Sequence, residues 1–332
     1  MAEVVLSGIS KAYGKTQALV DIGLTIPDGA FVVLLGPTGA GKTTTLRLIA
    51  GLDAPDGGDI RIGGASVLAD TPAQRDVAMV FQQYSLYPHL TVRDNLAFPL
   101  RSPMIALPEP EIAARVDAVA RTLRIAHKLD NKATALSGGE MQRVSIGRAL
   151  VRNPRIYLMD EPLSSLDAKL RADLRIELKR IHAELGATFL YVTHDQIEAM
   201  TMATHVGVLD HGRLVQFGTP REIYETPVST YVATRLGQPR IALLPADAFG
   251  PAPSGAAQIG LRPEHIVQGE GQPATVRRVE HLGDQTRLHL TFGPHEIITL
   301  ADPQTALTAG DSIPIRLQSP LWFDATGARI QE

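Results

Sequence analysis

Residues 36–43 read Gly36-Pro37-Thr38-Gly39-Ala40-Gly41-Lys42-Thr43, the pattern of a phosphate-binding loop: Gly, four residues, then Gly-Lys-Ser/Thr. Glycines let the backbone bend so that consecutive N–H groups converge on an anion. Lys42 can reach the β- and γ-phosphates of a nucleotide, and the Thr43 hydroxyl can bind Mg²⁺. This stretch therefore predicts that the chain binds a nucleoside triphosphate.

The residues around the loop fit the strand, loop and helix that this chemistry requires. Residues 30–35 are an apolar run of strand length. Residues 42–51, which include Thr44, are expected to form a helix whose N-terminus adds the positive end of its dipole to the anion site. The alternative is a chance glycine turn. Four fixed positions coincide in about one chain of this length in a hundred, and the flanking strand and helix make chance rarer still.

Composition places the chain among ordinary globular proteins. It has 332 residues, 44% hydrophobic residues, a mean hydropathy of +0.02 and no cysteine. No apolar run approaches the roughly 18 residues of a membrane span, and the first residues lack the features of a secretion signal. A cytosolic protein without a disulfide framework is expected. The net charge of −3 argues against a large nucleic-acid surface.

Two domains are expected from the change in pattern along the chain. Residues 1–237 alternate strand-like and helix-like segments, which predicts an open α/β sheet. Around residues 237–258 the sequence becomes rich in Gly, Pro and Ala. Beyond it, short strand-like runs at 275–279, 286–292 and 312–317 are separated by turns. Residues 238–332 are therefore predicted to form a small all-β barrel.

A second candidate element ends in two adjacent carboxylates, Asp160 and Glu161, after the four mostly apolar residues 156–159. The carboxyl end of a buried parallel strand lies at the ligand crevice of an α/β sheet. Asp160 would hold Mg²⁺, and Glu161 would orient and deprotonate the attacking water. An acidic pair at a strand end is often only a surface feature, but the upstream phosphate loop favours the catalytic interpretation.

A third element is Leu136-Ser137-Gly138-Gly139, followed by the helical segment 140–150. Ser137 can cap this helix, and the free N–H groups at its start can bind an anion. Alone, the segment would be an ordinary helix cap. A second anion site becomes useful if two copies meet head to tail and each closes the other's nucleotide.

These three elements, in this order, resemble the ATP-binding subunits of ABC transporters. The resemblance covers residues 1–237 and implies a P-loop (RecA-like) nucleotide-binding domain with a helical subdomain at about 89–150. Further matching segments are Phe81-Gln82-Gln83 in the Q-loop, Leu163-Ser164-Ser165-Leu166-Asp167 in the D-loop, Thr193-His194-Asp195 at the switch histidine, and Tyr13-Gly14, whose aromatic ring stacks on adenine.

The resemblance assigns roles to these positions. Two copies would enclose two molecules of ATP with Mg²⁺. In each site Glu161, His194 and Gln82 would be catalytic, and Thr43, Gln82 and Asp160 would hold the metal. Tyr13, residues 36–43 and Thr44 would bind the nucleotide, while the second copy would contribute Ser137, Gly138, Gly139 and Asp167.

The C-terminal portion narrows the resemblance to the ATPases of maltose-type carbohydrate importers. The matching segments are Leu261-Arg262-Pro263-Glu264-His265, Glu280-His281-Leu282-Gly283-Asp284 and Trp322-Phe323-Asp324. The family implies an OB-like regulatory domain, which contributes to dimerisation and can bind a cytosolic regulator. It also implies two transmembrane permease subunits and, indirectly, an extracytoplasmic solute-binding protein. The chain would then lie peripherally on the cytoplasmic face of the inner membrane.

The permease contact is expected on residues 83–115, where Tyr84, Leu86, Tyr87 and Pro88 form an apolar set. The alternative for that set is local packing inside the helical subdomain. A homodimer is expected, although the sequence leaves a heterodimer open. The substrate is open among sugars, polyols, glycosides and glycerol-phosphate diesters.

The sequence departs from the family at two positions. Glu140 stands where the family usually has Gln, and Ser165 replaces a common Asn. A carboxylate near a γ-phosphate would repel it, so Glu140 is expected to face away from the anion site. Ser165 keeps polar character, and little effect is expected.

Other functions explain fewer of these features. A soluble ABC ATPase of DNA repair or translation usually has paired cassettes or coiled coils, and exporters often fuse membrane spans to the ATPase. A small-molecule kinase has no use for Ser137 or His194. Nucleic-acid binding by residues 238–332 is disfavoured, since they hold seven arginines and no lysine against ten acidic residues.

Overall fold

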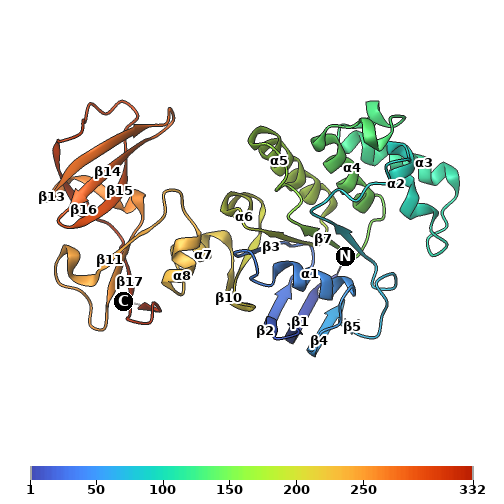
Figure 1. The fold of residues 1–332 in the computed structure, drawn as a ribbon, viewed down its shortest axis with the longest axis horizontal. Helices are drawn as coiled ribbons and strands as arrows, with labels where there is room; N and C mark the ends of the chain where they lie inside the picture. The colour runs from blue at the N-terminus through green and yellow to red at the C-terminus, as the bar shows by residue number, and fades with distance from the viewer. Residues whose placement is uncertain (1, 331–332) are drawn as a thin grey trace. The chain divides into compact units, whose positions relative to one another are not determined.

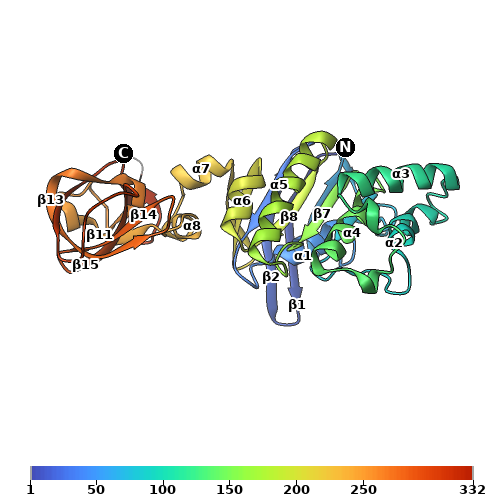
Figure 2. The same cartoon turned by 90° about the horizontal axis from the view of Figure 1, so that it is seen from above.

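The computed structural model describes residues 2–330, which form two compact units that divide between Pro220 and Arg221. The first unit is a layered α/β domain with an additional helical part, and the second is mainly β (Figures 1 and 2). Within the described residues, no helix combines the length and apolar character that a membrane crossing requires.

A six-stranded sheet with the order β10-β9-β3-β8-β7-β6 forms the centre of the first unit. Its strands pair in parallel except for β10, which is antiparallel to β9. Every residue of β3, β7 and β8 is buried, as expected for parallel strands covered on both faces. The strands are β3 (Phe31–Leu35), β6 (Val77–Val80), β7 (Ile156–Asp160), β8 (Phe189–Thr193), β9 (His205–Asp210) and β10 (Arg213–Gly218).

Helix α1 (Lys42–Ala50) lies between this sheet and a second, antiparallel sheet with the order β2-β1-β4-β5. One hydrophobic core joins Leu46 and Ile49 of α1 to Ile22 of the second sheet and to Leu34 and Leu190 of the first. This packing fixes where α1 begins, at the edge of the central sheet. The second sheet consists of β1 (Val4–Tyr13), β2 (Thr16–Ile26), β4 (Gly57–Ile62) and β5 (Ala65–Ser66).

The opposite face of the central sheet is covered by α5 (Ala168–Leu185) and α6 (Gln196–Met202). His182 of α5 packs edge-on against Phe31 and Phe189, with ring centroids 5.2 and 5.3 Å away. The helical part contains α2 (Val92–Ala97), α3 (Glu109–Thr122) and α4 (Gly138–Leu150), with short 3-10 turns at Phe98–Arg101, Ala126–Lys128 and Ala133–Ala135.

The second unit contains two four-stranded sheets around one hydrophobic core. The first sheet consists of β11 (Ala242–Pro245), β12 (Gln258–Leu261), β17 (Leu321–Phe323) and β18 (Arg329–Ile330). The second consists of β13 (Ile266–His281), β14 (Thr286–Phe292), β15 (His295–Ala301) and β16 (Ser312–Leu317). The unit therefore has the small all-β character expected from the sequence, together with the short helices α7 (Pro220–Glu225) and α8 (Thr230–Arg235).

The boundary between the compact units lies earlier than the predicted change at 237/238, because α8 packs with the C-terminal strands. Ala233 shares a small core with Ile241 and Phe323. Buried Arg262 donates to the carbonyls of Tyr224, Ala233 and Leu236, and its guanidinium lies 3.8 Å from the Tyr224 ring centre. One arginine thus ties both short helices to the β strands.

We expect Arg262→Met to destabilise the second unit by at least about 2 kcal/mol, since three main-chain carbonyls lose their donor. Calorimetry of the full chain should show the corresponding unfolding transition at lower temperature, while the transition that responds to nucleotide stays in place. Arg221→Ala, which removes a surface ion pair with Glu225, should change little. An unchanged profile for Arg262→Met would contradict the role of this arginine.

Candidate nucleotide site

The phosphate loop connects β3 to α1, and two of its glycines are required by the backbone geometry. Gly41 has a φ of 99°, and a Cβ there would lie 2.7 Å from the Ala18 carbonyl oxygen. A Cβ on Gly36 would lie 2.7 Å from the Leu209 carbonyl oxygen. Larger residues would displace the loop from the strands that support it. A Cβ at the exposed Gly39 would meet open space, but its φ of 83° is also a left-handed conformation that favours glycine.

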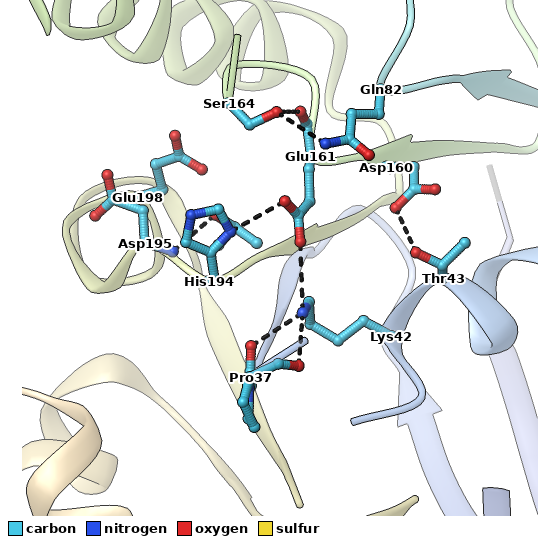
Figure 3. A network of polar contacts seen from close by, with 12 residues as sticks. Pro37, Lys42, Thr43, Gln82, Asp160, Glu161, Ser164, His194, Asp195 and Glu198 are labelled. Atoms are coloured by element: carbon cyan, nitrogen blue, oxygen red, sulfur yellow. Dashed lines mark hydrogen bonds and ion pairs between the residues drawn. The ribbon is translucent and has the colours of Figure 1, made fainter. Parts of the chain in front are cut away.

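Lys42 is buried and is surrounded by oxygen atoms. Its Nζ donates to the carbonyls of Gly36 and Pro37 at 2.9 and 3.1 Å, and it lies 3.4 Å from Glu161 Oε1 (Figure 3). A buried ammonium group requires such partners because desolvation of an unpaired charge is unfavourable. The same Nζ can pair with phosphate oxygens above the loop.

Glu161 occupies the centre of the polar network in Figure 3. It follows the last residue of β7, and its amide still donates to Val192 of β8 at 3.1 Å. Its φ is 42°, a left-handed conformation that is unusual for a residue with a side chain. Strained backbones of this kind cluster at functional sites, where the surrounding contacts hold them. Here the Ser164 hydroxyl donates to the Glu161 carbonyl at 2.9 Å.

His194 approaches Glu161 from the neighbouring strand. It directly follows β8, and its Nδ1 lies 3.0 Å from Glu161 Oε2. Because an ionised carboxylate only accepts hydrogen bonds, this contact places a proton on Nδ1 and directs Nε2 away from Glu161. The imidazole is 60% exposed, so its second nitrogen can reach a ligand. Asp195 caps α6 by accepting from the Ile197 amide at 2.7 Å, which fixes the residue after the histidine.

Thr43 and Asp160 form a pair of hard oxygen donors. The Thr43 hydroxyl donates to Asp160 Oδ1 at 2.9 Å. Burial raises the pKa of Asp160, and the nearby negative charge of Glu161 acts in the same direction, whereas the Thr43 hydrogen bond opposes them. A cation at this position would relieve both effects. Hydroxyl and carboxylate oxygens are ligands of Mg²⁺, so the pair fits that ion.

Gln82 joins the network through Ser164, a residue to which the sequence alone assigned no role. Its Nε2 donates to the Ser164 hydroxyl at 3.4 Å, and Ser164 in turn holds the Glu161 carbonyl. Ser164 also donates its amide to that carbonyl at 3.2 Å. A serine three residues after Glu161 is the sequence signal for this local turn.

The structure thus brings together Lys42, Thr43, Gln82, Asp160, Glu161 and His194 in one network, whereas the other predicted residues make different contacts. Tyr13 is 46% exposed, and its hydroxyl donates to Asp53 at 2.7 Å, which fixes the ring. Asp167 caps α5 through the Leu170 amide at 2.9 Å. Thr38 is exposed at the top of the loop, and Thr44 is half-buried in the first turn of α1.

Ser137 is the N-cap residue of α4. A Cβ on Gly139 would collide with Leu170 of α5, so this glycine permits close helix packing. A Cβ on Gly138 would lie 3.2 Å from the Tyr84 hydroxyl. The expectation that Glu140 faces away is wrong. Glu140 Oε2 accepts from both the amide and the hydroxyl of Ser137 at 2.8 Å, because a carboxylate at this position completes a capping box.

A glycine loop carrying Lys42 and Thr43, next to strands that end in Asp160–Glu161 and His194, defines a P-loop ATPase. The chain matches the ABC transporter family model over residues 19–164 and the TOBE domain model over residues 259–323. The chain belongs to the ABC transporter family and is one of its ATP-binding, ATP-hydrolysing subunits.

Relatives of similar length align along the whole chain. It is 42% identical to the sn-glycerol-3-phosphate import ATP-binding protein UgpC of Ralstonia nicotianae, over 99% of this chain and 98% of the relative. It is 41% identical to the lactose transport ATP-binding protein LacK of Rhizobium radiobacter, over 100% of both chains. An uncharacterised ABC transporter ATP-binding protein of Sinorhizobium fredii, y4oS, is 42% identical over 99% of this chain and 95% of its own.

Solved structures resemble about two thirds of the chain. cbiO1, part of the cbiONQ transporter complex of Clostridium perfringens, gives a TM-score of 0.62 at 28% identity, over 66% of this chain and 89% of its own. A bacterial ABC transporter cassette solved as a dimer gives a TM-score of 0.59 at 30% identity, and the match covers 66% of this chain and 99% of the cassette. These similarities confirm the P-loop ABC fold expected from the sequence.

We expect Ser164→Ala to lower the ATPase kcat about tenfold, because the alanine no longer holds the left-handed backbone of Glu161 or contacts Gln82. Steady-state ATPase assays and titration with a fluorescent ADP analogue separate this effect from binding, which should change less than twofold. Ser164→Thr, which keeps the hydroxyl, should retain most of the activity. Equal losses of kcat in Ser164→Ala and Ser164→Thr would show that the Ser164 hydroxyl does not support catalysis.

Proposed function

We propose that this chain energises an ABC importer as a head-to-tail dimer that encloses two molecules of ATP. The observation that carries the proposal is the Glu161-centred network, in which Lys42 and His194 contact the two oxygens of one carboxylate beside the Thr43–Asp160 pair. Phosphate binding, water activation and metal binding thereby gather at one sheet edge.

Within each site, different residues of this chain would bind the phosphates, stack on the base and activate water. The loop N–H groups and Lys42 bind the phosphates, and the exposed ring of Tyr13 stacks on the base. An arriving phosphate gives Lys42 a new anionic partner, which frees Glu161 to orient and deprotonate the attacking water. His194 then contacts the γ-phosphate through the nitrogen that faces away from Glu161.

The same network would hold the metal ion of the substrate complex. Thr43, Asp160 and Gln82 supply a hydroxyl, a carboxylate and an amide group, which suits a small divalent cation. Mg²⁺ bound there neutralises charge on the β- and γ-phosphates. The raised pKa of Asp160 makes its ionised form more dependent on that cation than a surface aspartate would be.

A second copy would complete each site with Ser137, Gly138, Gly139 and Asp167. Ser137 and Asp167 are exposed at the N-termini of α4 and α5, where helix dipoles favour an anion. A similar cassette is described as dimeric, and another structure of it as a post-hydrolysis state bound to ADP and Pi. ATP would therefore draw two copies together, and hydrolysis would let them separate.

The surface after Gln82 would receive the permease subunits. Phe98 and Met104 are 48% and 65% exposed, and Phe81 is exposed as well. Of the apolar set expected there, Pro88 is exposed, whereas Tyr84, Leu86 and Tyr87 are half-buried. Tyr87 packs on Phe98 with ring centroids 4.4 Å apart. The apolar set would therefore contribute both to packing within the helical part and to contact with the permease.

The transported compound would be a sugar, polyol, glycoside or glycerol-phosphate compound, since similar proteins are named for import of sn-glycerol-3-phosphate and transport of lactose. An extracytoplasmic binding protein would select it, and the second unit would be open to a cytosolic regulator. In this arrangement the chain would lie on the cytoplasmic face of the inner membrane.

Glu161→Gln should bind ATP, lose at least about 99% of ATPase activity, and accumulate as an ATP-dependent dimer, because the amide keeps the shape of the side chain but cannot take a proton. Gel filtration with light scattering in ATP and in ADP measures the dimer. Glu184→Gln, on an exposed i,i+4 pair of α5, is the control and should behave as the unmodified chain. Rapid hydrolysis by Glu161→Gln would exclude Glu161 as the base.

A tagged pull-down from native membranes in mild detergent, read by mass spectrometry, tests the importer assignment. We expect two multi-span permease subunits, and a binding protein beside them. Recovery with soluble partners alone would instead favour a soluble ABC ATPase.

A further inference from the structure

Ser137, at the start of α4, contacts Glu140, and Glu140 in turn contacts Lys128; the proposed nucleotide site gives neither Glu140 nor Lys128 a role. One oxygen of Glu140, Oε2, accepts from the Ser137 amide and from its hydroxyl, both at 2.8 Å. The other oxygen, Oε1, lies 3.0 Å from Lys128 Nζ. All three groups lie near the surface, with Lys128 and Glu140 about three-quarters covered.

The hydroxyl of Ser137 can serve only one acceptor at a time. A serine has one O–H proton, and here Glu140 receives it. Phosphate oxygens accept hydrogen bonds and do not donate them when ionised. For the Ser137 hydroxyl to donate to a phosphate of the facing subunit, it must therefore leave Glu140.

Glu140 also brings a full negative charge to the same position. The Ser137 amide, Lys128 and the Ser137 hydroxyl lower its pKa to about 2, so it is ionised throughout the physiological range. A hydrogen bond to an ionised acceptor is roughly twice as strong as one between neutral groups. The carboxylate is thus a strong competitor for the hydroxyl and repels an incoming phosphate.

We propose that Glu140 restrains ATP-driven dimer closure by holding the Ser137 hydroxyl and by opposing the partner's γ-phosphate, and that Lys128 moderates this charge. The inference rests on the head-to-tail dimer proposed above. In this scheme Glu140 positions the Ser137 hydroxyl, and its charge acts on the phosphate across space. The ATP concentration at which two copies close is consequently higher than it would be with a neutral side chain.

Two substitutions move the charge in opposite directions while leaving the helix cap in place. Glu140→Gln keeps an oxygen that can accept from the Ser137 amide, which is the backbone half of a capping box, but removes the charge. Lys128→Met keeps the length of the side chain and leaves the Glu140 charge without its partner. Lys128 carries no role in the cap itself, so the two variants separate charge from helix stability.

The test uses the full chain with Glu161→Gln as the parent, so that hydrolysis does not disturb the equilibrium. The fraction of dimer is measured against ATP concentration by sedimentation velocity. We expect Glu140→Gln to lower the ATP midpoint about tenfold, equivalent to about 1.4 kcal/mol, and Lys128→Met to raise it about threefold. The double variant should match Glu140→Gln alone, because Lys128 has no carboxylate left to moderate.

Glu111→Gln is the matched control, since it also removes a carboxylate with one cationic partner, Arg115, from the helical part. It should leave the midpoint unchanged. Binding of a fluorescent ADP analogue to the monomer reports on the chain's own loop and should be equal in all variants. Thermal unfolding confirms that each variant is folded.

The outcomes separate this inference from the proposed function. A parent that stays monomeric in ATP would overturn the head-to-tail dimer itself. A parent that dimerises while Glu140→Gln shifts the midpoint less than twofold, or shifts it upward, would overturn the restraint. An upward shift would mean that Glu140 prepares Ser137 for the phosphate. If Glu140→Gln unfolds, the direction in which Lys128→Met shifts the ATP midpoint still shows whether the Glu140 charge opposes or favours closure.

Discussion

The parallel pairing of β3, β7 and β8 is the constraint on which the rest of the first unit depends. Leu35 pairs with Thr193, and Asp160 pairs with Val192, so three strands end at nearly the same level. Each strand is followed by a different functional segment, the phosphate loop, Glu161 and His194. A shift of one residue in any of these registers would separate groups that now lie within 3.0–3.4 Å.

Burial makes this register strict. All fifteen positions of the three strands are buried, and alternate residues face two different cores. One core includes α1 and the antiparallel sheet, while the rings of Phe31 and Phe189 face His182 of α5. The two apolar layers thus fix the strands whose ends carry the polar groups of the site.

Much of this was predictable from the sequence because local patterns carried it. The helix expected at 42–51 is α1, Lys42–Ala50, closed by Gly51 in a left-handed cap, and the strands expected at 286–292 and 312–317 have those bounds. The strand expected at 275–279 is part of the much longer β13. Gly269 and Gly271, at φ values of 130° and 126°, lie in an irregularity of its pairing with β16.

The features that the sequence did not indicate depend on contacts between distant segments or on the direction in which a side chain points. The left-handed backbone of Glu161 and the link from Gln82 through Ser164 arise only when the strands are assembled. Glu140 was expected to face away on charge grounds, yet the local capping geometry and Lys128 outweigh that argument. The earlier unit boundary likewise follows from Arg262, whose carbonyl partners lie 26–38 positions away in sequence.

The contacts of Arg262 also bear on how this protein can be divided for separate production of its parts. A fragment that starts at the change in composition near residue 238 would retain the arginine but lose α7 and α8, and with them all three carbonyl acceptors. Its guanidinium would then lose these acceptors and the Tyr224 ring that covers it. A fragment that begins at Arg221 keeps the donor and its acceptors together, so a separate C-terminal unit should begin there.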